Sequence, residues 1–440
     1  MTVTKIYEAF FSKAQVQVSP NGLGLFRISF GILTFISTFR FWLNGWIDEL
    51  YLKPAYQFKY WGFQWVVVPS SEILYAMHGL LLLASVSITL GLFYRINIIL
   101  FFCVFTYIEL LDVSYYLNHY YFMSCLSFLM IFLPLDKSLN YFKNNKPSTV
   151  PFYTIWALRA QVGMVYFFAG IAKLNYDWLI QGQPLKIWLT PRTDTPLIGF
   201  LFAYPEISFI MSWLGALFDL ALPFLLCHKK TRLIAFVVCV LFHTITGYLF
   251  PIGMFPYIMI FAVLIFFPTH LGLKDKCDNL TVPFTPKVKA IVLWPFLFIL
   301  FQSFIALRHW CYPGNHLWHE RGFRFAYHVM LIEKNAYLEY IIKDKNSSKK
   351  WIEYPREHLS QTQEKAMSTQ PDLILQFAHH LRDQYAAKNI NVEIYAKSTA
   401  SLNGRKSSPL IDEKANLATI RIHPFSETPW ILPLPSDLKH

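Results

Sequence analysis

The stretch YTIWALRAQVGMVYFFAGIAKLNYDW, residues 153–178, is apolar along most of its length and carries few ionisable side chains. A helix needs about 20 apolar residues to cross the hydrocarbon core of a bilayer. The stretch therefore predicts a membrane-spanning helix over residues 153–173. The same criterion predicts about nine spans in the chain: residues 22–42, 72–92, 96–113, 119–134, 153–173, 206–227, 231–250, 254–268 and 288–307.

The composition of the whole chain agrees with this interpretation. Of its 440 residues, 55% are hydrophobic, 18% are aromatic and 15% are charged, whereas about a quarter of an ordinary soluble domain is charged. These values exclude a water-soluble enzyme and a disordered chain. The formal charge of +12 would suggest nucleic acid as the partner of a soluble protein. In a membrane protein basic residues instead mark the cytoplasmic loops, so we expect a lipid bilayer and no nucleic acid.

Lysine and arginine gather in one of the two sets of predicted loops. With the N-terminus in the cytoplasm, the internal set is Lys5, Lys13, Arg95, Lys137, Lys143, Lys146, Lys229, Lys230, Arg232, Lys274, Lys276, Lys287 and Lys289. The external set is Arg40, Lys53, Lys59, Lys186 and Arg192. This asymmetry follows the positive-inside rule, and an odd number of spans places the C-terminus outside. The Phe-, Ile- and Lys-rich composition favours a bacterial plasma membrane as the location.

Hydropathy falls sharply after Leu307, which divides the chain into two predicted parts. Residues 1–307 form a helical transmembrane domain, and residues 308–440 form an exoplasmic α+β domain. In the second part, alternating apolar residues predict strands over 323–333 and 336–343, joined at Lys334-Asn335. A helix is predicted over 370–388 and a further strand over 389–397.

Three residues of the fifth predicted span are spaced by seven: Arg159, Tyr166 and Lys173. On a helix this spacing forms one stripe that drifts only about 20° per step. Gly163 and Gly170 share the spacing, and small residues let a neighbouring helix or a flat ligand come close. This helix is therefore expected to present one polar, indented face.

Ionisable residues inside spans are costly and usually have a partner or a function. Two interpretations of Lys173 stay open: a lysine that snorkels to the exoplasmic surface, or a desolvated neutral amine that acts as a base. His119 is either an interfacial histidine among tyrosines or a functional group. Asp219, Arg27 and Arg159 are expected to be buried structural charge partners.

Other residues of the spans are less informative. His243 is more readily explained as a core histidine with a satisfied hydrogen bond than as a ligand. The chain has no HExxH or similar metal-ligand spacing, no glycine-rich phosphate loop and no Gly-x-Ser-x-Gly elbow. Cys277 and Cys311 are predicted on opposite sides of the membrane, which excludes a cysteine-rich metal site. We therefore predict chemistry without a metal.

Several segments together resemble the vitamin K-dependent γ-glutamyl carboxylases, of the bacterial type with an HTTM domain. The most specific is the YFxAGxxKL-x2-DW string, here Tyr166 to Leu174 followed by Asp177-Trp178. The other segments follow in the family's order: Leu25 to Gly31, Leu117 to Tyr121, Phe242-His243 with Ile252 to Phe255, Glu320 to Met330, and Thr428-Pro429-Trp430. The resemblance covers nearly the whole chain.

This resemblance implies an integral membrane enzyme. Such an enzyme oxidises reduced vitamin K, the hydroquinone, to the epoxide with O2. The strong base so generated removes a γ-proton from glutamate in a protein or peptide substrate, and the carbanion captures CO2 to give γ-carboxyglutamate. A base of that strength persists only where water is excluded, which a pocket inside a membrane provides.

The family's site residues carry over by their place in these motifs. Lys173 is implied as the base that deprotonates the hydroquinone, and desolvation near a positive group such as Arg159 would favour its neutral form. His119 is implied as the second catalytic residue. The implied cofactor-binding residues are Asn118, Tyr166, His243, Phe255 and Met259. The implied substrate-binding residues are Tyr327, which stands where the family more often has Trp, and Met330.

Two alternatives to the carboxylase remain. A relative could keep the quinone site and only oxidise the quinol to the epoxide. A membrane protein of this kind could also bind lipid or a partner and catalyse nothing. The presence of both Lys173 and His119 favours an enzyme, because a scaffold has no need of a lysine and a histidine at the level of the lipid.

Overall fold

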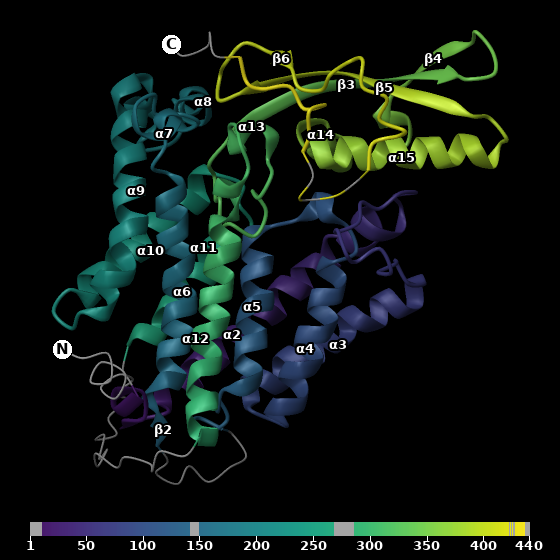
Figure 1. The fold of residues 1–440 in the computed structure, drawn as a ribbon. Coiled ribbons are helices and arrows are strands. Elements are labelled where there is room, and N and C mark those ends of the chain that lie inside the picture. Colours follow the sequence, from purple (N-terminus) through teal and green to yellow (C-terminus); the bar gives the residue numbers. More distant parts are fainter. Residues whose placement is uncertain are drawn as a thin grey trace.

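The computed structural model describes residues 11–140, 149–267, 286–421, 423, 425 and 427–435. Side chains are described for these residues except 286–291. Among the residues used above to predict topology, Lys5, Lys143, Lys146, Lys274, Lys276 and Cys277 lie outside the described part. A bundle of long helices makes up one end of the molecule, and a sheet with two helices beneath it makes up the other (Figure 1).

Among the residues that the structure describes, six apolar stretches of helix are long enough to cross a membrane by length and composition. They are α2 (Asn21–Leu43), α3 (Ser71–Leu90), α6 (Phe152–Ala172), α9 (Pro205–Cys227), α10 (Arg232–Leu249) and Val292–Cys311, which comprises most of α12 (Pro286–Leu307) and the short η6 (Arg308–Cys311). The predicted count of about nine spans is not confirmed. The three other predicted spans form shorter helices: α4 (Tyr94–Glu109), α5 (Asn118–Phe132) and α11 (Phe255–Ala262), which continues into η5 (Val263–Phe266).

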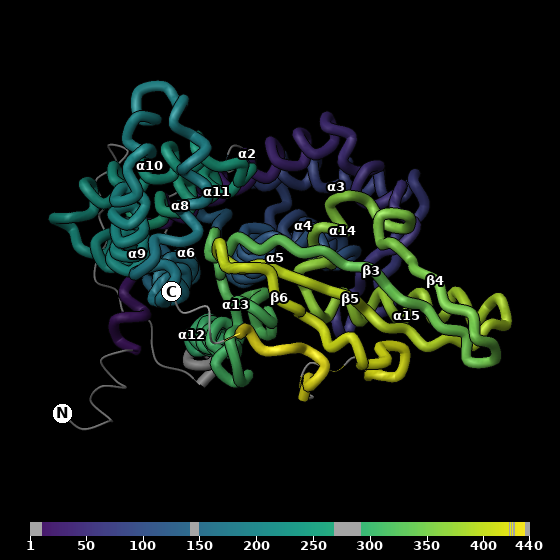
Figure 2. The backbone as a smooth tube through the Cα atoms, turned by 90° about the horizontal axis from the view of Figure 1, so that it is seen from above, coloured from purple at the N-terminus to yellow at the C-terminus, as the bar shows by residue number. Residues whose placement is uncertain are grey.

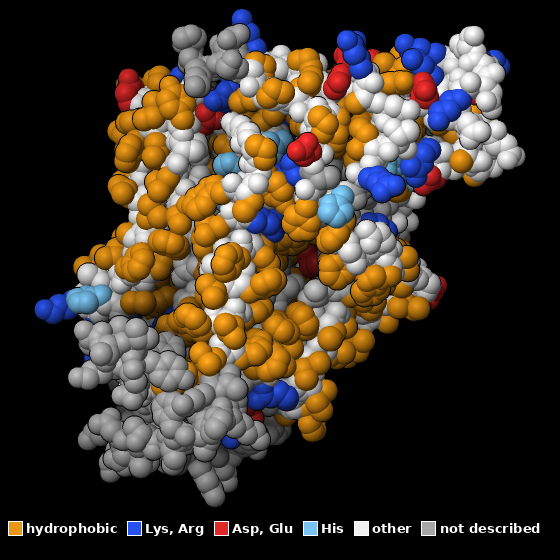
Figure 3. Space-filling view, in the orientation of Figure 1, with side chains coloured by type: hydrophobic (Ala, Val, Ile, Leu, Met, Phe, Trp, Pro, Cys, Tyr) orange, Lys and Arg blue, Asp and Glu red, His pale blue; other side chains and the backbone are white. Residues whose placement is uncertain are grey.

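The surface of the bundle is apolar. Leu83, Leu233 and Phe304 are each about two-thirds exposed, and hydrophobic side chains cover most of the described bundle in Figure 3. Charged side chains gather instead on the end that carries the sheet. Large apolar surfaces of this extent are typical of contact with lipid. The chain is a multi-pass membrane protein.

The opposite end contains an antiparallel sheet in the order β4-β3-β5-β6. Its strands are β3 (Lys334–Asp344), β4 (Lys350–Glu353), β5 (Val392–Leu402) and β6 (Ser408–Pro409). Every second residue of β5 is buried, as a strand with one covered face requires. Helices α14 (Gln361–Thr369) and α15 (Pro371–Ala387) lie against the sheet. The predicted helix over 370–388 and the strands over 336–343 and 389–397 are confirmed, with shifted ends.

The predicted strand over 323–333 is wrong, because this segment forms successive turns. Phe325, Tyr327 and Met330 adopt positive φ values of 65°, 56° and 51°. Backbone groups here bond to side chains of the bundle: the Phe325 N–H donates to Tyr116 Oη at 2.8 Å. Lys334 and Asn335, predicted as a turn, instead begin β3 and pair with β5. Alternation of apolar residues could not reveal these tertiary partners.

The sheet lies over one side of the bundle, above α3, α4 and α5, whereas α9 and α10 stand on the other side (Figures 1 and 2). The core beneath the sheet also includes Trp178 and Leu185, from the short helices α7 (Tyr176–Leu179) and α8 (Leu185–Leu189). One apolar core therefore joins the sheet to the segment that follows α6. The residues around Lys173 lie at this junction.

Candidate functional site

Lys173 lies directly after the last residue of α6 and is buried. Its Nζ atom is 2.8 Å from Oδ2 of Asp219 on α9 and 3.3 Å from the carbonyl oxygen of Ala169. Only 7% of the Lys173 side chain and 8% of the Asp219 side chain are exposed. The ring of Trp178 lies 5.2 Å from Nζ. Lys173 therefore does not snorkel to the surface but forms a buried ion pair.

Close packing of α6 against α9 brings this pair together. A Cβ atom added at Gly170 would lie 2.7 Å from Cγ of Leu220, and one at Gly163 would lie 3.3 Å from Cβ of Pro223. The predicted indentation therefore accommodates a neighbouring helix, and α9 fills the space that a flat ligand would need. Asp219, next to Leu220, is held opposite Lys173 by this contact.

Arg159 is not the neighbour of Lys173 that we expected. The two residues are fourteen positions apart on α6, which corresponds to about 21 Å along a helix. Arg159 instead donates to the carbonyl oxygens of Ile265 and Phe266 at 3.0 and 3.1 Å. Shared angular position on a helix does not bring residues together along its axis. The charge that faces Lys173 is the carboxylate of Asp219.

Four of the predicted residues form a continuous aromatic group. The rings of His119 and Phe255 are 6.0 Å apart, and those of Phe255 and His243 are 5.8 Å apart. Nε2 of His243 is 2.8 Å from the hydroxyl of Tyr166. Met259 is buried one turn after Phe255 on α11. The structure thus brings residues from α5, α6, α10 and α11 to one place.

This aromatic group is linked to the ion pair through α9. Phe218, which precedes Asp219, packs against the rings of Tyr166 and His243 at 5.9 and 6.1 Å. Nδ1 of His243 is buried and has no hydrogen-bond partner among the described residues. A buried polar atom without a partner is costly. His243 therefore offers an unused hydrogen-bonding position inside the bundle.

Tyr327 and Met330 belong to the turn segment 323–333, and Asn118 contacts it. Asn118 accepts a hydrogen bond from the Tyr116 hydroxyl at 2.9 Å and donates to the His328 carbonyl oxygen at 3.0 Å. Tyr327 is fully buried, and its hydroxyl donates to Oε1 of Gln302 at 3.3 Å. Met330 is partly buried. Tyr327 thus points into the bundle and not toward water.

Two protein-family models match successive parts of the chain. The HTTM domain matches residues 16–270, more than half of the chain. The lumenal domain of vitamin K-dependent gamma-carboxylase matches residues 287–437. The chain belongs to the vitamin K-dependent gamma-carboxylase family. No solved structure matches the chain.

The carboxylase family shares a cofactor, a location and a class of substrate. Members use reduced vitamin K, are embedded in the membrane and act on proteins that contain glutamate. The first match contains Lys173, His119 and the aromatic group, and the second contains the sheet and the turn segment. In this carboxylase-family chain the two matched regions meet around α7 and the turn segment.

Sequence reasoning missed one connection between the two ends of this carboxylase-family chain. Asp177, part of the Asp-Trp motif, accepts hydrogen bonds from Arg405 at 2.6 Å and from Asn403 at 2.8 Å. Its side chain is 6% exposed. Asp177 therefore joins the segment after α6 to the end of β5. A pairing across more than 220 positions leaves no signal in a single sequence.

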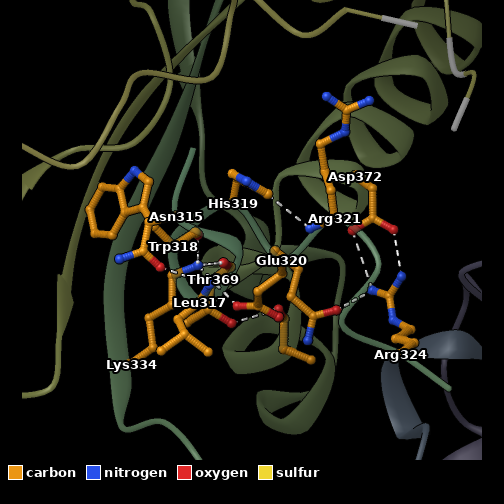
Figure 4. A network of polar contacts seen from close by, with 12 residues as sticks. Asn315, Leu317, Trp318, His319, Glu320, Arg321, Arg324, Lys334, Thr369 and Asp372 are labelled. Carbon is orange, nitrogen blue, oxygen red and sulfur yellow. Dashed lines mark hydrogen bonds and ion pairs between the residues drawn. The ribbon is translucent and has the colours of Figure 1, made fainter. Parts of the chain in front are cut away.

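A second polar network fixes the chain between the last apolar helix and β3 (Figure 4). Nζ of Lys334 is 2.9 Å from Oε1 of Glu320 and 2.6 Å from the carbonyl oxygen of Trp318. Arg324 pairs with Asp372 of α15 at 2.5 Å. Burial raises the pKa of the Glu320 carboxyl, although Lys334 acts in the opposite direction. This network holds α13 (His316–His319) against the sheet domain.

Proposed function

We propose that this chain is a vitamin K-dependent γ-glutamyl carboxylase. It would couple oxidation of reduced vitamin K by O2 to the carboxylation of glutamate in a protein or peptide with CO2. The observation that carries this proposal is the buried pair of Lys173 and Asp219 beside the aromatic group. The proposed location is a bacterial plasma membrane, with the N-terminus in the cytoplasm, a transmembrane domain over residues 1–307 and an exoplasmic domain over residues 308–440.

The residues present fit a reduced naphthoquinone. Tyr166, Phe255 and Met259 offer flat or polarizable apolar surfaces, and the unpartnered Nδ1 of His243 suits a ring oxygen. The oxidation of the bound hydroquinone would supply the strong base that the carboxylation needs. The site therefore combines an apolar lining with few polar groups, as sites for small molecules usually do.

Two small hollows adjoin this group, between α2, α5 and α11. The space open to the centre of a water molecule is about 10 Å³ in one, which is lined by Phe122 and Phe261, and about 20 Å³ in the other, which is lined by Tyr120 and Ile258. Tyr120 and Ile258 are sequence neighbours of His119 and Met259. Each hollow is therefore the size of about one water molecule, far below the volume of a ligand pocket. Neither hollow holds a naphthoquinone or an isoprenoid chain as the structure stands.

Lys173 is proposed as the residue that takes a proton from the hydroquinone. To do so it must first be neutral. Transfer of its own proton to Asp219 over 2.8 Å gives an amine and a carboxylic acid, and a dry surrounding favours two neutral groups over two charged ones. Asp219 is therefore proposed as the proton store that leaves Lys173 free to act as a base.

His119 and Asn118 are proposed to act at the edge of the site away from Lys173. The ring of His119 packs against Phe255, which in turn packs against His243. The amide of Asn118 holds the backbone of the turn segment at His328. In this arrangement His119 donates or accepts a hydrogen bond at the reacting centre. Asn118 fixes the backbone of the turn segment. That segment carries Tyr327 and Met330, the proposed contacts of the glutamate substrate.

One observation favours the alternative of a relative that only oxidises quinol. Tyr327 has no exposed surface and bonds to Gln302 and Gln161 inside the bundle. A peptide that arrives from water cannot touch this side chain unless the turn segment moves. Oxidation of a quinol alone does not require contact with Tyr327.

The test uses the purified full chain in detergent with reduced vitamin K, labelled bicarbonate and a short peptide that contains glutamate. Wild type is compared with Lys173→Ala and with Lys186→Ala, a control lysine that is exposed. Label in the peptide for wild type and Lys186→Ala alone supports the carboxylase. Epoxide without label supports the quinol-oxidising relative. Neither product, in folded protein, supports a protein that only binds lipid or a partner.

A further inference from the structure

Three histidines from separate parts of the chain meet beneath the sheet. His309 lies in η6, His316 begins α13, and His328 lies in the turn segment. The ring centroids are 4.5 Å apart for His309 and His316, 4.8 Å for His309 and His328, and 5.3 Å for His316 and His328. Each ring offers one nitrogen, and these three nitrogens all lie within 4.8 Å of one another.

These rings have unused nitrogen atoms. Both ring nitrogens of His328 and Nε2 of His316 are buried and have no hydrogen-bond partner among the residues described, and His328 is 3% exposed. His309 differs, because its Nδ1 is 2.9 Å from the carbonyl oxygen of Ala306. That bond places the proton on Nδ1 and leaves the lone pair of Nε2 free, which is the arrangement of a histidine that binds a metal.

The surroundings keep these imidazoles neutral. Burial lowers the pKa of His316 to about 4, with smaller contributions from His309 and His319. Burial also lowers the pKa of His328, and His309, His316, Lys173 and Arg308 add to this effect. A neutral imidazole is the form that ligates a metal.

We propose that His309, His316 and His328 bind one divalent transition-metal ion of the zinc type. Three imidazole ligands leave a fourth, open position, as in many zinc sites that accept an exogenous ligand. Tetrahedral Zn–N bonds of about 2.0–2.1 Å separate the nitrogens by about 3.3 Å, so the three nitrogens, now within 4.8 Å of one another, must move closer when the ion binds. The positive group of Arg308, which acts on His328, favours an anion in the open position.

The frame around the three histidines is fixed by bonds outside the cluster. The Asn118 amide donates to the His328 carbonyl oxygen at 3.0 Å. Asn315 caps α13 by accepting from the Leu317 N–H at 2.9 Å, and Lys334 donates to the Trp318 carbonyl oxygen (Figure 4). These bonds fix the backbone that carries His316 and His328. The spacing of residues 309, 316 and 328 matches no metal motif, which is why the sequence predicted none.

The test measures metal binding directly and needs no activity. The full chain, purified in detergent with a tag that contains no histidine, is stripped with a chelator and equilibrated with Zn²⁺ or Co²⁺. We expect about one ion per chain by mass spectrometry and the visible absorption of four-coordinate Co²⁺. His316→Gln and His328→Gln should each weaken binding at least about 100-fold, since even outer partners of ligands contribute 10–100-fold.

Two matched controls make the result decisive. His319→Gln and His379→Gln each change a histidine whose Nε2 is buried and unpartnered but which lies outside the cluster, and both should bind the ion as wild type does. Where His316→Gln does not fold, His316→Cys keeps a ligand and should add a sulfur-to-Co²⁺ band to the spectrum. No stoichiometric ion in wild type, or an ion equally well bound after His316→Gln or His328→Gln, overturns the proposal.

Discussion

At the level of single residues, the proposed chemistry depends on how Lys173 and Asp219 share a buried position. Each group would be costly alone, because a buried charge without a partner loses its hydration. Together they are neutral overall, and a proton can pass between them. The sequence indicated a lysine with a function, but it could not show which of Asp219 and Arg159 would face it, since that choice depends on how α9 packs.

The first prediction concerns this pair. Asp219→Ala leaves the Lys173 amine unpaired in the bundle and should lower the free energy of unfolding by about 3–5 kcal/mol. Lys173→Ala combined with Asp219→Ala should recover part of that loss. Denaturant titration of the purified protein in detergent measures both values.

The control for this prediction is Glu206→Ala, which removes an exposed carboxylate from the same helix and should change stability by no more than about 0.5 kcal/mol. If Asp219→Ala were as stable as wild type and the double variant were no different, the two groups would not be coupled.

At the scale of elements, α6 and α9 pack through glycine, and this contact positions the pair. The sequence predicted close approach at Gly163 and Gly170 from their spacing. It also predicted α15 and β5, whose periodicity reflects one covered face. The strand predicted over residues 323–333 was wrong. Tyr116 and Asn118 bond to the backbone of this segment, and residues such as Phe325 are held at positive φ.

The second prediction tests the helix contact. Gly170→Ala places a methyl group 2.7 Å from Cγ of Leu220, so α9 must shift, at a cost of about 1–3 kcal/mol. Because that shift also moves Asp219, epoxide formation should fall with stability. Gly79→Ala is the matched change, since nothing lies within 4 Å of an added Cβ there. Equal stability and activity in the two variants would contradict the packing described.

The third prediction concerns pH and α15. Burial lowers the pKa of His379, and Arg382 acts in the same direction, whereas Asp383 and the carbonyl groups of Leu417 and Ile420 oppose it. The folded state therefore binds fewer protons than the unfolded state, whose histidine pKa is about 6.5. This contribution to stability is complete above about pH 6.5 and is lost as the pH falls below it.

Thermal unfolding followed from pH 8 to pH 5 measures the effect. His379→Gln should make the decline in stability below pH 6.5 shallower, whereas His228→Gln, at an exposed position, should leave it unchanged. A decline of the same slope in His379→Gln would show that this histidine does not contribute.

At the scale of the whole molecule, the matched HTTM and lumenal regions meet through one core and a few polar bonds. The pair of Asp177 and Arg405 is the strongest of these bonds, because both side chains are largely buried and the contact is bidentate. The sequence separated a membrane part from a soluble part. It could not predict how they meet, since the contacts join residues far apart in the chain.

The fourth prediction follows from that junction. Asp177→Ala leaves the Arg405 guanidinium without its partner and should cost about 3 kcal/mol, mainly by loosening the sheet domain from the bundle. Limited proteolysis should then cut the chain between α12 and β3 faster than in wild type. Asp383→Ala breaks an exposed pair with Arg382 and should cost less than about 1 kcal/mol. Unchanged proteolysis of Asp177→Ala would contradict a role for Asp177 at the junction.

The central claim is that the Lys173 amine starts the vitamin K-dependent reaction. Its most direct test is the initial rate of labelled CO2 incorporation into a glutamate peptide, compared between wild type and Lys173→Ala at equal amounts of folded protein. Loss of a base in general acid–base catalysis costs about 10²–10⁴-fold, and the account predicts a fall of at least the lower value. Equal rates in the two proteins would contradict it.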